Sequence, residues 1–116
     1  MKTYLRFSIK GELEELKTKD KFFDKNNLSN YSLSNYTCTN ISYNNNLYIL
    51  LSNIDEKELN ITKLPFYDKI IYGPFYLFKI QPDYTIQSMT EYKFLNLLTS
   101  NAKEIPDYSS DDFAEN

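Results

Sequence analysis

Cys38 is the only cysteine of this 116-residue chain, and no histidine accompanies it. Histidine is the usual general base near neutral pH and the commonest metal ligand, and a zinc site needs about three or four Cys or His ligands. The composition therefore excludes a zinc module, a Cys-His or Ser-His nucleophile pair and a disulfide within the chain. We expect no metal, no cofactor and no catalytic residue, and we interpret Cys38 as a buried, inert thiol rather than a reactive one.

Aromatic side chains between positions 66 and 78 form the densest group with binding potential. Alternating aromatics on a strand can stack on the bases of single-stranded RNA. The net charge of -3 argues against that use, because nucleic-acid affinity depends on positive charge. We interpret the group first as core and second as a protein-binding patch, in which the candidate partner-binding residues are Tyr72, Phe75, Tyr76 and Phe78.

The end of the chain, residues 105–116, is a second candidate binding segment. Its acidic side chains, Asp107, Asp111, Asp112 and Glu115, surround Tyr108 and Phe113. Such a tail is most often a solvated chain end, and the alternative is a short linear motif that docks on a basic, apolar groove. Tyr108 and Phe113 therefore join the candidate partner-binding residues.

Enzymatic chemistry finds little support in the remaining residues. Carboxylates cluster at residues 12–15 and 55–58, each expected to be the first turn of a helix. The helix dipole favours negative charge at that position, which explains both clusters without a catalytic role. A carboxylate pair acting as acid and base would need a cleft that a small single core rarely provides. Gly11 and Gly73 are the only glycines, which excludes the glycine-rich loops that bind nucleotide phosphates.

Hydrophobic periodicity predicts the elements of the first half of the chain. Residues 3–10 alternate, with Leu5 and Phe7 on one face, as expected of a half-buried strand. Residues 12–24 are rich in helix formers and predict a short helix. Residues 25–35 read as a loop. The runs 36–43 and 47–53, separated by three asparagines, predict a β-hairpin because asparagine tolerates the left-handed conformation of tight turns.

Local signals predict the elements of the second half in the same way. Asp55 is expected to cap a short helical turn that extends to Leu59. A strand is expected to begin at Phe75, directly after a Gly-Pro pair, and to end near Ile80. Ser88, with a glutamate three residues later, is typical of a capping box and predicts a helix over residues 89–99.

The stretch KLPFYDKIIYGPFYLFKI and the later T-E-x-x-F segment resemble a family of small, uncharacterised proteins encoded by nucleocytoplasmic large DNA viruses. The resemblance covers about thirty residues. Its pattern, a Tyr-Gly-Pro element that opens an apolar strand and a Thr-Glu helix start, falls on Tyr72–Pro74 and on Thr90, Glu91 and Phe94. The resemblance implies a viral origin and brings no established catalytic residues.

Together these observations predict an α+β fold, a mostly antiparallel sheet of about four strands with one or two helices packed on one face. Residues 1–104 would form one domain and residues 105–116 an acidic tail. The preferred function is a non-enzymatic accessory protein, virus-encoded, that binds a protein partner and neither nucleic acid nor membrane. The alternatives are a small acidic inhibitor or immunity protein that masks a basic active site, and an enzyme of unknown type. With no signal-peptide-like apolar stretch, we expect an intracellular, cytoplasmic location, the host cytoplasm for a viral protein.

Overall fold

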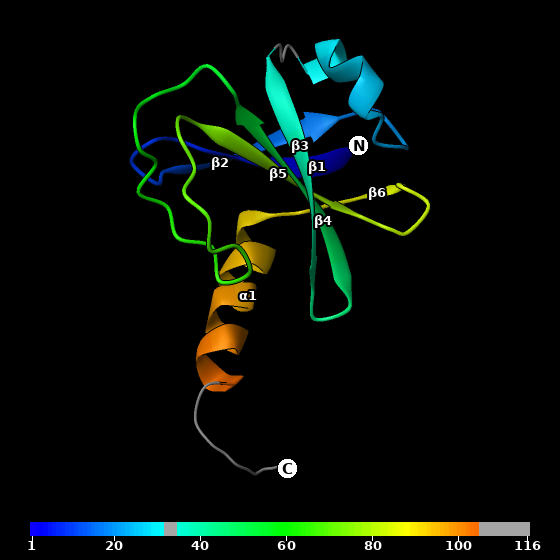
Figure 1. Ribbon diagram of the computed structural model, residues 1–116. Helices are drawn as coiled ribbons and strands as arrows, with labels where there is room; N and C mark the ends of the chain where they lie inside the picture. The colour runs from blue at the N-terminus through cyan, green and yellow to red at the C-terminus, as the bar shows by residue number, and fades with distance from the viewer. Residues whose placement is uncertain (32–34, 105–116) are drawn as a thin grey trace.

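The computed structural model describes residues 1–31 and 35–104, which form an antiparallel sheet of six strands with a single α-helix among them (Figure 1). The strand order is β2-β1-β5-β4-β3, and β6 pairs with β5 off this path. The predicted α+β architecture is confirmed, with a larger sheet than the predicted four strands. Along the chain the elements are β1 (Lys2–Phe7), β2 (Leu13–Thr18), the 3-10 helix η1 (Lys25–Tyr31), β3 (Tyr36–Tyr43), β4 (Asn46–Asn53), β5 (Phe75–Ile80), β6 (Ile86–Gln87) and α1 (Glu91–Glu104).

The segment predicted as a helix over residues 12–24 is wrong, because it contains strand β2. β2 pairs antiparallel with β1 in an unbroken register from Lys2 opposite Thr18 to Phe7 opposite Leu13. Leu13 and Leu16 lie three residues apart, a spacing that puts them on one side of a helix but on opposite sides of a strand. A hydrophobic cluster lies on each side of β2, and Leu13 packs against one cluster while Leu16 packs against the other.

The β3–β4 hairpin is confirmed, and its turn has the predicted chemistry. Asn44 and Asn45 adopt positive φ angles of 50° and 62°, as the two central residues of a type I′ turn require. Asn46, predicted as the third loop residue, is instead the first residue of β4 and pairs with Tyr43. The register then continues to Tyr36 opposite Asn53.

The sheet has a hydrophobic core on each face. Leu5 and Phe7 face a cluster that includes Phe94 of α1, and Tyr4 faces a second cluster with Phe23 and residues of η1. In Figure 1, η1 lies at the upper end of the sheet and α1 projects from its lower end. β1 is therefore buried on both faces and not on one as predicted. Tyr4 is only 6% exposed.

Helix α1 begins at Glu91 and not at Met89, so the predicted capping box is wrong. The Thr90 hydroxyl accepts the hydrogen bond from the Lys93 amide at 3.2 Å, which makes Thr90 the N-cap. Ser88 instead accepts a hydrogen bond from the Thr3 amide at 3.2 Å and ties the helix approach to β1. The predicted loop at residues 25–35 also differs, since η1 occupies its first part.

No helix within the described residues is long and apolar enough to cross a membrane. Residues 105–116, predicted to form the acidic tail, lie outside the described residues.

Candidate functional site

Residues 54–74 connect β4 to β5, and this segment, called the 54–74 loop below, has an inverted pattern of burial. Leu59 and Ile61 are 52% and 64% exposed, while the polar Asn60 between them is 6% exposed. A polar residue inside and large aliphatic residues outside are the informative departures from the usual distribution. The inversion marks this loop as the candidate functional site.

The Asn60 side chain explains how the inversion is stabilised. Its amide nitrogen donates to the carbonyl oxygen of Gly73 at 2.7 Å and to that of Ser8 at 3.1 Å. Its amide oxygen accepts a hydrogen bond from the backbone N–H of Thr62 at 2.8 Å. Buried polar groups require such partners. Asn60 therefore faces inward as the connector of three chain segments and turns its two aliphatic neighbours outward.

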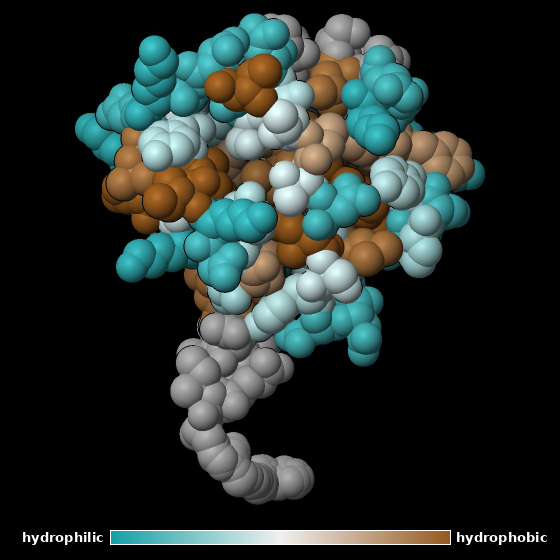
Figure 2. Space-filling view, in the orientation of Figure 1, coloured by the Kyte–Doolittle hydropathy of each residue, from teal (hydrophilic) through white to brown (hydrophobic). Residues whose placement is uncertain are grey.

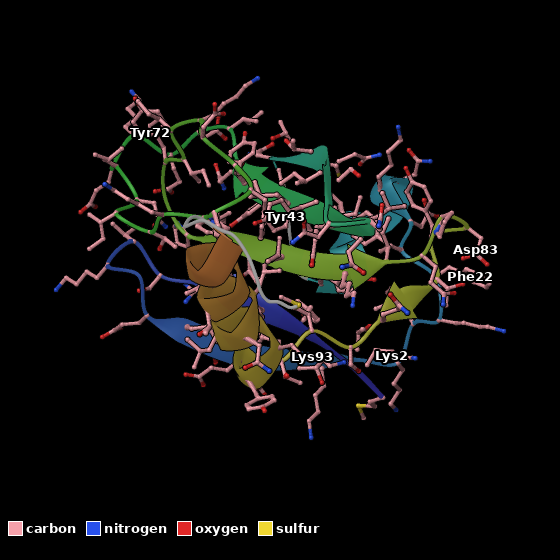
Figure 3. All side chains as sticks on the ribbon, turned by 90° about the horizontal axis from the view of Figure 1, so that it is seen from below. Lys2, Phe22, Tyr43, Tyr72, Asp83 and Lys93 are labelled. Carbon is pink, nitrogen blue, oxygen red and sulfur yellow. The ribbon has the colours of Figure 1, made fainter. Side chains whose placement is uncertain are left out.

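A second stretch of the same loop runs antiparallel to this one and carries the opposite wall of the site. The backbone N–H of Asn60 donates to the Ile71 carbonyl oxygen at 2.9 Å, and Leu59 forms an isolated bridge with Tyr72. Ile71 points inward and is 7% exposed, whereas Ile70 and Tyr72 are 67% and 45% exposed. Tyr72 lies at the outer rim of the loop in Figure 3.

An apolar groove of about 510 Å³ lies between these walls. Figure 2 shows a hydrophobic area on the side of the molecule where the 54–74 loop runs in Figure 1. The charged residues of the lining are two lysines and one aspartate. The groove is lined by residues 59–64 and 67–71, among which the charged ones are Lys63, Asp68 and Lys69.

The turn at residues 64–67, in the middle of the 54–74 loop, is held against the sheet by aromatic contacts. The Phe66 ring stacks on Tyr48 with ring centroids 5.0 Å apart and also contacts Tyr43 at 5.5 Å. Leu64, beside it, is buried in the core. These contacts fix one end of the groove to β3 and β4.

Gly73 lies near the C-terminal end of the 54–74 loop, just before β5. Its φ angle of 73° belongs to the left-handed region, and its N–H donates to the Glu58 carbonyl oxygen at 2.7 Å. A Cβ atom at this position would lie 2.7 Å from the Cβ of Glu56. The predicted helical turn capped by Asp55 is wrong. The Asp55 amide instead donates to the side chain of Asn53 at 2.7 Å, and residues 56–59 run on without helical structure.

The structure separates the aromatic residues predicted as a binding group. Phe75 and Phe78 are 0% exposed and lie on opposite faces of β5, where Phe75 stacks on Phe7 at 4.6 Å and Phe78 on Tyr4 at 4.3 Å. Both are core residues and offer no surface to a partner, which corrects their interpretation as partner-binding residues.

Of the other predicted residues, Tyr76 is half-buried on β5 and its ring contacts Tyr36 at 5.8 Å. Tyr72 is exposed and forms a bridge with Leu59 of the groove lining, although it does not itself line the groove. Tyr108 and Phe113 lie outside the described residues. Sequence reasoning missed Leu59, Ile61 and Ile70, although an Asn between two aliphatic residues was visible as a local signal.

The only thiol of the chain belongs to Cys38. Cys38 is half-buried on β3 rather than buried as expected. Burial raises the pKa of its thiol above the usual value, with a smaller opposing effect from Lys25, so the thiol is protonated at neutral pH. Among the described residues no group of three or more Cys, Asp or Glu side chains is arranged to hold a metal ion.

Comparison of the chain with protein-family models, with curated proteins and with solved structures finds no match.

Proposed function

We propose that this chain is a non-enzymatic protein-interaction module, an accessory protein of viral origin, that binds a protein partner through the apolar groove of the 54–74 loop. The observation that carries the proposal is the exposure of Leu59, Ile61 and Ile70 around the buried Asn60. Exposed apolar side chains that surround a groove are typical of protein interaction sites. The viral origin rests on the resemblance of the Tyr72–Pro74 and Thr90–Phe94 segments.

The magnitude of the available burial supports a weak, reversible interaction. Full burial of an aliphatic side chain contributes roughly 1.5–3 kcal/mol, and association costs at least about 4 kcal/mol. The three exposed aliphatic residues of the groove lining, Leu59, Ile61 and Ile70, are already partly covered, with exposed fractions of 52–67%. The burial that remains for these three side chains contributes about 3–5.5 kcal/mol in total, which is close to the cost of association. The groove on its own therefore sustains only a weak complex, and tighter binding would need contacts outside it.

The charges of the groove lining indicate the chemistry of the partner segment. Lys63 and Lys69 contribute two positive charges and Asp68 one negative charge. A partner segment that combines aliphatic or aromatic side chains with a nearby carboxylate would match both the apolar walls and the excess of lysine. Complementary charge at the margin of a site contributes more to the association rate than to affinity.

The alternative function, an acidic inhibitor that masks a basic active site, would depend on residues 105–116. All 13 basic residues and 12 of the 16 acidic residues lie between positions 1 and 104, and the other four acidic residues are Asp107, Asp111, Asp112 and Glu115. The described part of the chain is thus close to neutral. The inhibitor function and docking through Tyr108 and Phe113 remain the alternative proposal for that segment, and an enzyme of unknown type is the second alternative.

Selection of peptides from a phage-displayed library on the full chain tests the proposed function. We expect the selected peptides to be apolar with an acidic residue, and their affinity to fall at least about tenfold for Ile61→Ser and Ile70→Ser. The matched control is Ile54→Ser, because Ile54 is 60% exposed and does not line the groove.

Two results would contradict the groove as the binding site. One is equal binding of the selected peptides to Ile61→Ser, Ile70→Ser and the unmodified chain. The other is selection of basic peptides whose binding is lost when residues 107–116 are deleted, which would favour the alternative function of the acidic segment.

A further inference from the structure

Among the described residues, strand β3 forms one edge of the sheet and has no partner strand on one side of its backbone. Its pairing with β4 runs without interruption over all eight residues, from Tyr36 opposite Asn53 to Tyr43 opposite Asn46. In the part of the chain that the structure describes, the backbone groups of Cys38, Asn40 and Ser42 make no hydrogen bond outside the sheet. The edge is therefore regular, long and open to pairing.

The two edges of the sheet differ in charge. β2, at the opposite edge, carries Glu14, Glu15 and Lys17 among its six residues. β3, with the sequence YTCTNISY, contains no charged residue and no proline. Charges and prolines on edge strands are the usual protection against pairing with another chain. β2 has this protection, and β3 lacks it.

The turn geometry identifies the outward backbone groups of β3. In a hairpin with a two-residue turn, the residues that flank the turn form the first hydrogen-bonded pair, and alternate pairs follow along the strands. Here Tyr43 and Asn46 flank the turn, so residues 37, 39, 41 and 43 bond to β4. The N–H and C=O groups of residues 36, 38, 40 and 42 therefore point away from the sheet.

We propose that β3 pairs antiparallel with β3 of a second copy of this chain, with the two-fold axis at Thr39. This register overlaps residues 36–42 and brings the outward groups of Cys38 opposite those of Asn40 of the partner subunit. Each face of one sheet then continues into the same face of the other. About eight backbone hydrogen bonds would join the two strands.

A second copy suits this edge because β3 is compatible with itself. Like charges opposite each other destabilise a strand pair, and a charge-free strand places none across the axis. The side chains near the axis, Cys38, Thr39 and Asn40, are short and polar or weakly polar, so they fit opposite one another across the axis. The inference does not depend on the groove of the 54–74 loop, because the proposed pairing uses backbone groups of residues 36–42, none of which lines the groove.

Sedimentation equilibrium of the full chain tests the pairing. We expect a dimer at about 100 µM, and at least about a tenfold weaker association for Asn40→Pro. Proline at position 40 removes an outward N–H that does not bond to β4, so the hairpin should remain folded. Asn40→Ser is the control, because it loses the side-chain bond to the Tyr84 hydroxyl but keeps the outward N–H. Asn40→Lys, which adds an edge charge, is the second variant if the proline chain does not fold.

Disulfide trapping tests the register in a Cys38→Ser background. Thr39 faces Thr39 of the partner subunit in a non-hydrogen-bonded pair, whose Cα atoms lie about 4.5 Å apart, so Thr39→Cys should form a covalent dimer on mild oxidation. Thr37 lies about 13 Å along the strand from its copy, and Thr37→Cys should not cross-link.

Several outcomes would overturn the inference. A chain that is monomeric at about 100 µM would contradict the proposed dimer. A monomer that binds an extended peptide at β3 would contradict it as well. A dimer that persists in both Asn40→Pro and Asn40→Lys does the same. A dimer that is lost on Ile61→Ser would place self-association at the groove, and equal trapping of Thr37→Cys and Thr39→Cys would reject the register.

Discussion

The side chain of Asn60 donates a hydrogen bond to the carbonyl oxygen of Gly73 over 2.7 Å, between residues that lie on the two antiparallel stretches of the 54–74 loop. The same nitrogen reaches the carbonyl oxygen of Ser8 in the β1–β2 turn. One buried amide thus fixes the two walls of the groove to each other and to the sheet. A groove that is fixed before binding loses less conformational entropy when a partner occupies it.

Replacement of Asn60 by alanine is expected to destabilise the protein by about 2–4 kcal/mol. The change leaves the buried carbonyl oxygen of Gly73 and the part-buried N–H of Thr62 without their partners, whereas the Ser8 carbonyl oxygen keeps its hydrogen bond from the Gly11 N–H. Each unpartnered group costs roughly 1–3 kcal/mol, reduced where water can enter. Urea unfolding measures the effect. Asn96→Ala, at an exposed helical position, is the control and should stay within about 0.5 kcal/mol of the unmodified chain. Equal urea midpoints for Asn60→Ala and the unmodified chain would show that the amide does not hold the loop.

Gly73→Ala is expected to cost about 1–3 kcal/mol for two separable reasons. The φ angle of 73° strains any residue with a Cβ, and the new Cβ would collide with the side chain of Glu56. The double variant Gly73→Ala with Glu56→Gly removes the collision and keeps the strain. Urea midpoints of Glu56→Gly alone provide the reference for this cycle. If the double variant is no more stable than expected from the two single changes added together, the collision contributes nothing.

The sequence predicted elements that local chemistry determines and failed where both faces of the sheet matter. Asn44 and Asn45 specify the β3–β4 turn by themselves, and Pro74 prevents β5 from beginning earlier. The Leu13 and Leu16 spacing fits a helix stripe and a strand buried on both faces equally well. Only the pairing of β2 with β1, and a core on each side, decides for the strand.

The candidate site was less predictable because long-range contacts create it. An aliphatic residue next to an asparagine reads as core, yet Asn60 takes the inward position because Ser8, 52 residues away in the chain, offers a carbonyl oxygen there. For the aromatic run around β5, the sequence predicts core first and a binding patch second, and it does not separate the core residues of the run from its surface residues. Phe75 and Phe78 are buried because β5 lies between β1 and β4, and a hydrophobic cluster covers each face of the sheet there.

Thr90→Ala is expected to destabilise the start of α1 by about 1 kcal/mol, because the Lys93 amide loses its capping partner. Thr90→Ser keeps the hydroxyl and should be close to neutral. Ser88→Ala should also cost about 0.5–1.5 kcal/mol, but through the lost bond to Thr3 of β1. Hydrogen exchange of the Lys93 amide separates the two. It should accelerate in Thr90→Ala beyond the change in global stability, and a comparable local acceleration in Ser88→Ala would restore Ser88 as the cap.

The last prediction concerns alkaline pH and the hydroxyl of Tyr31. Burial is the larger cause, and the hydrogen bond to Asp20 at 2.8 Å the next, of a strongly raised Tyr31 pKa. A tyrosine whose pKa is higher in the folded chain than in the unfolded chain stabilises the fold fully below the unfolded value, about 10, and loses that contribution as the pH rises above it.

We therefore expect the free energy of unfolding to fall above pH of about 10 in the unmodified chain. Tyr31→Phe cannot ionise and also lacks the bond to Asp20, so it should be less stable by about 1 kcal/mol near neutral pH. Its stability should decline less steeply at alkaline pH, and the two curves should converge. Urea midpoints across this pH range measure both effects, with Tyr92→Phe, at a site 73% exposed, as the control that follows the unmodified chain. Parallel curves for Tyr31→Phe and the unmodified chain would mean that another group, such as the buried Tyr48, causes the alkaline loss.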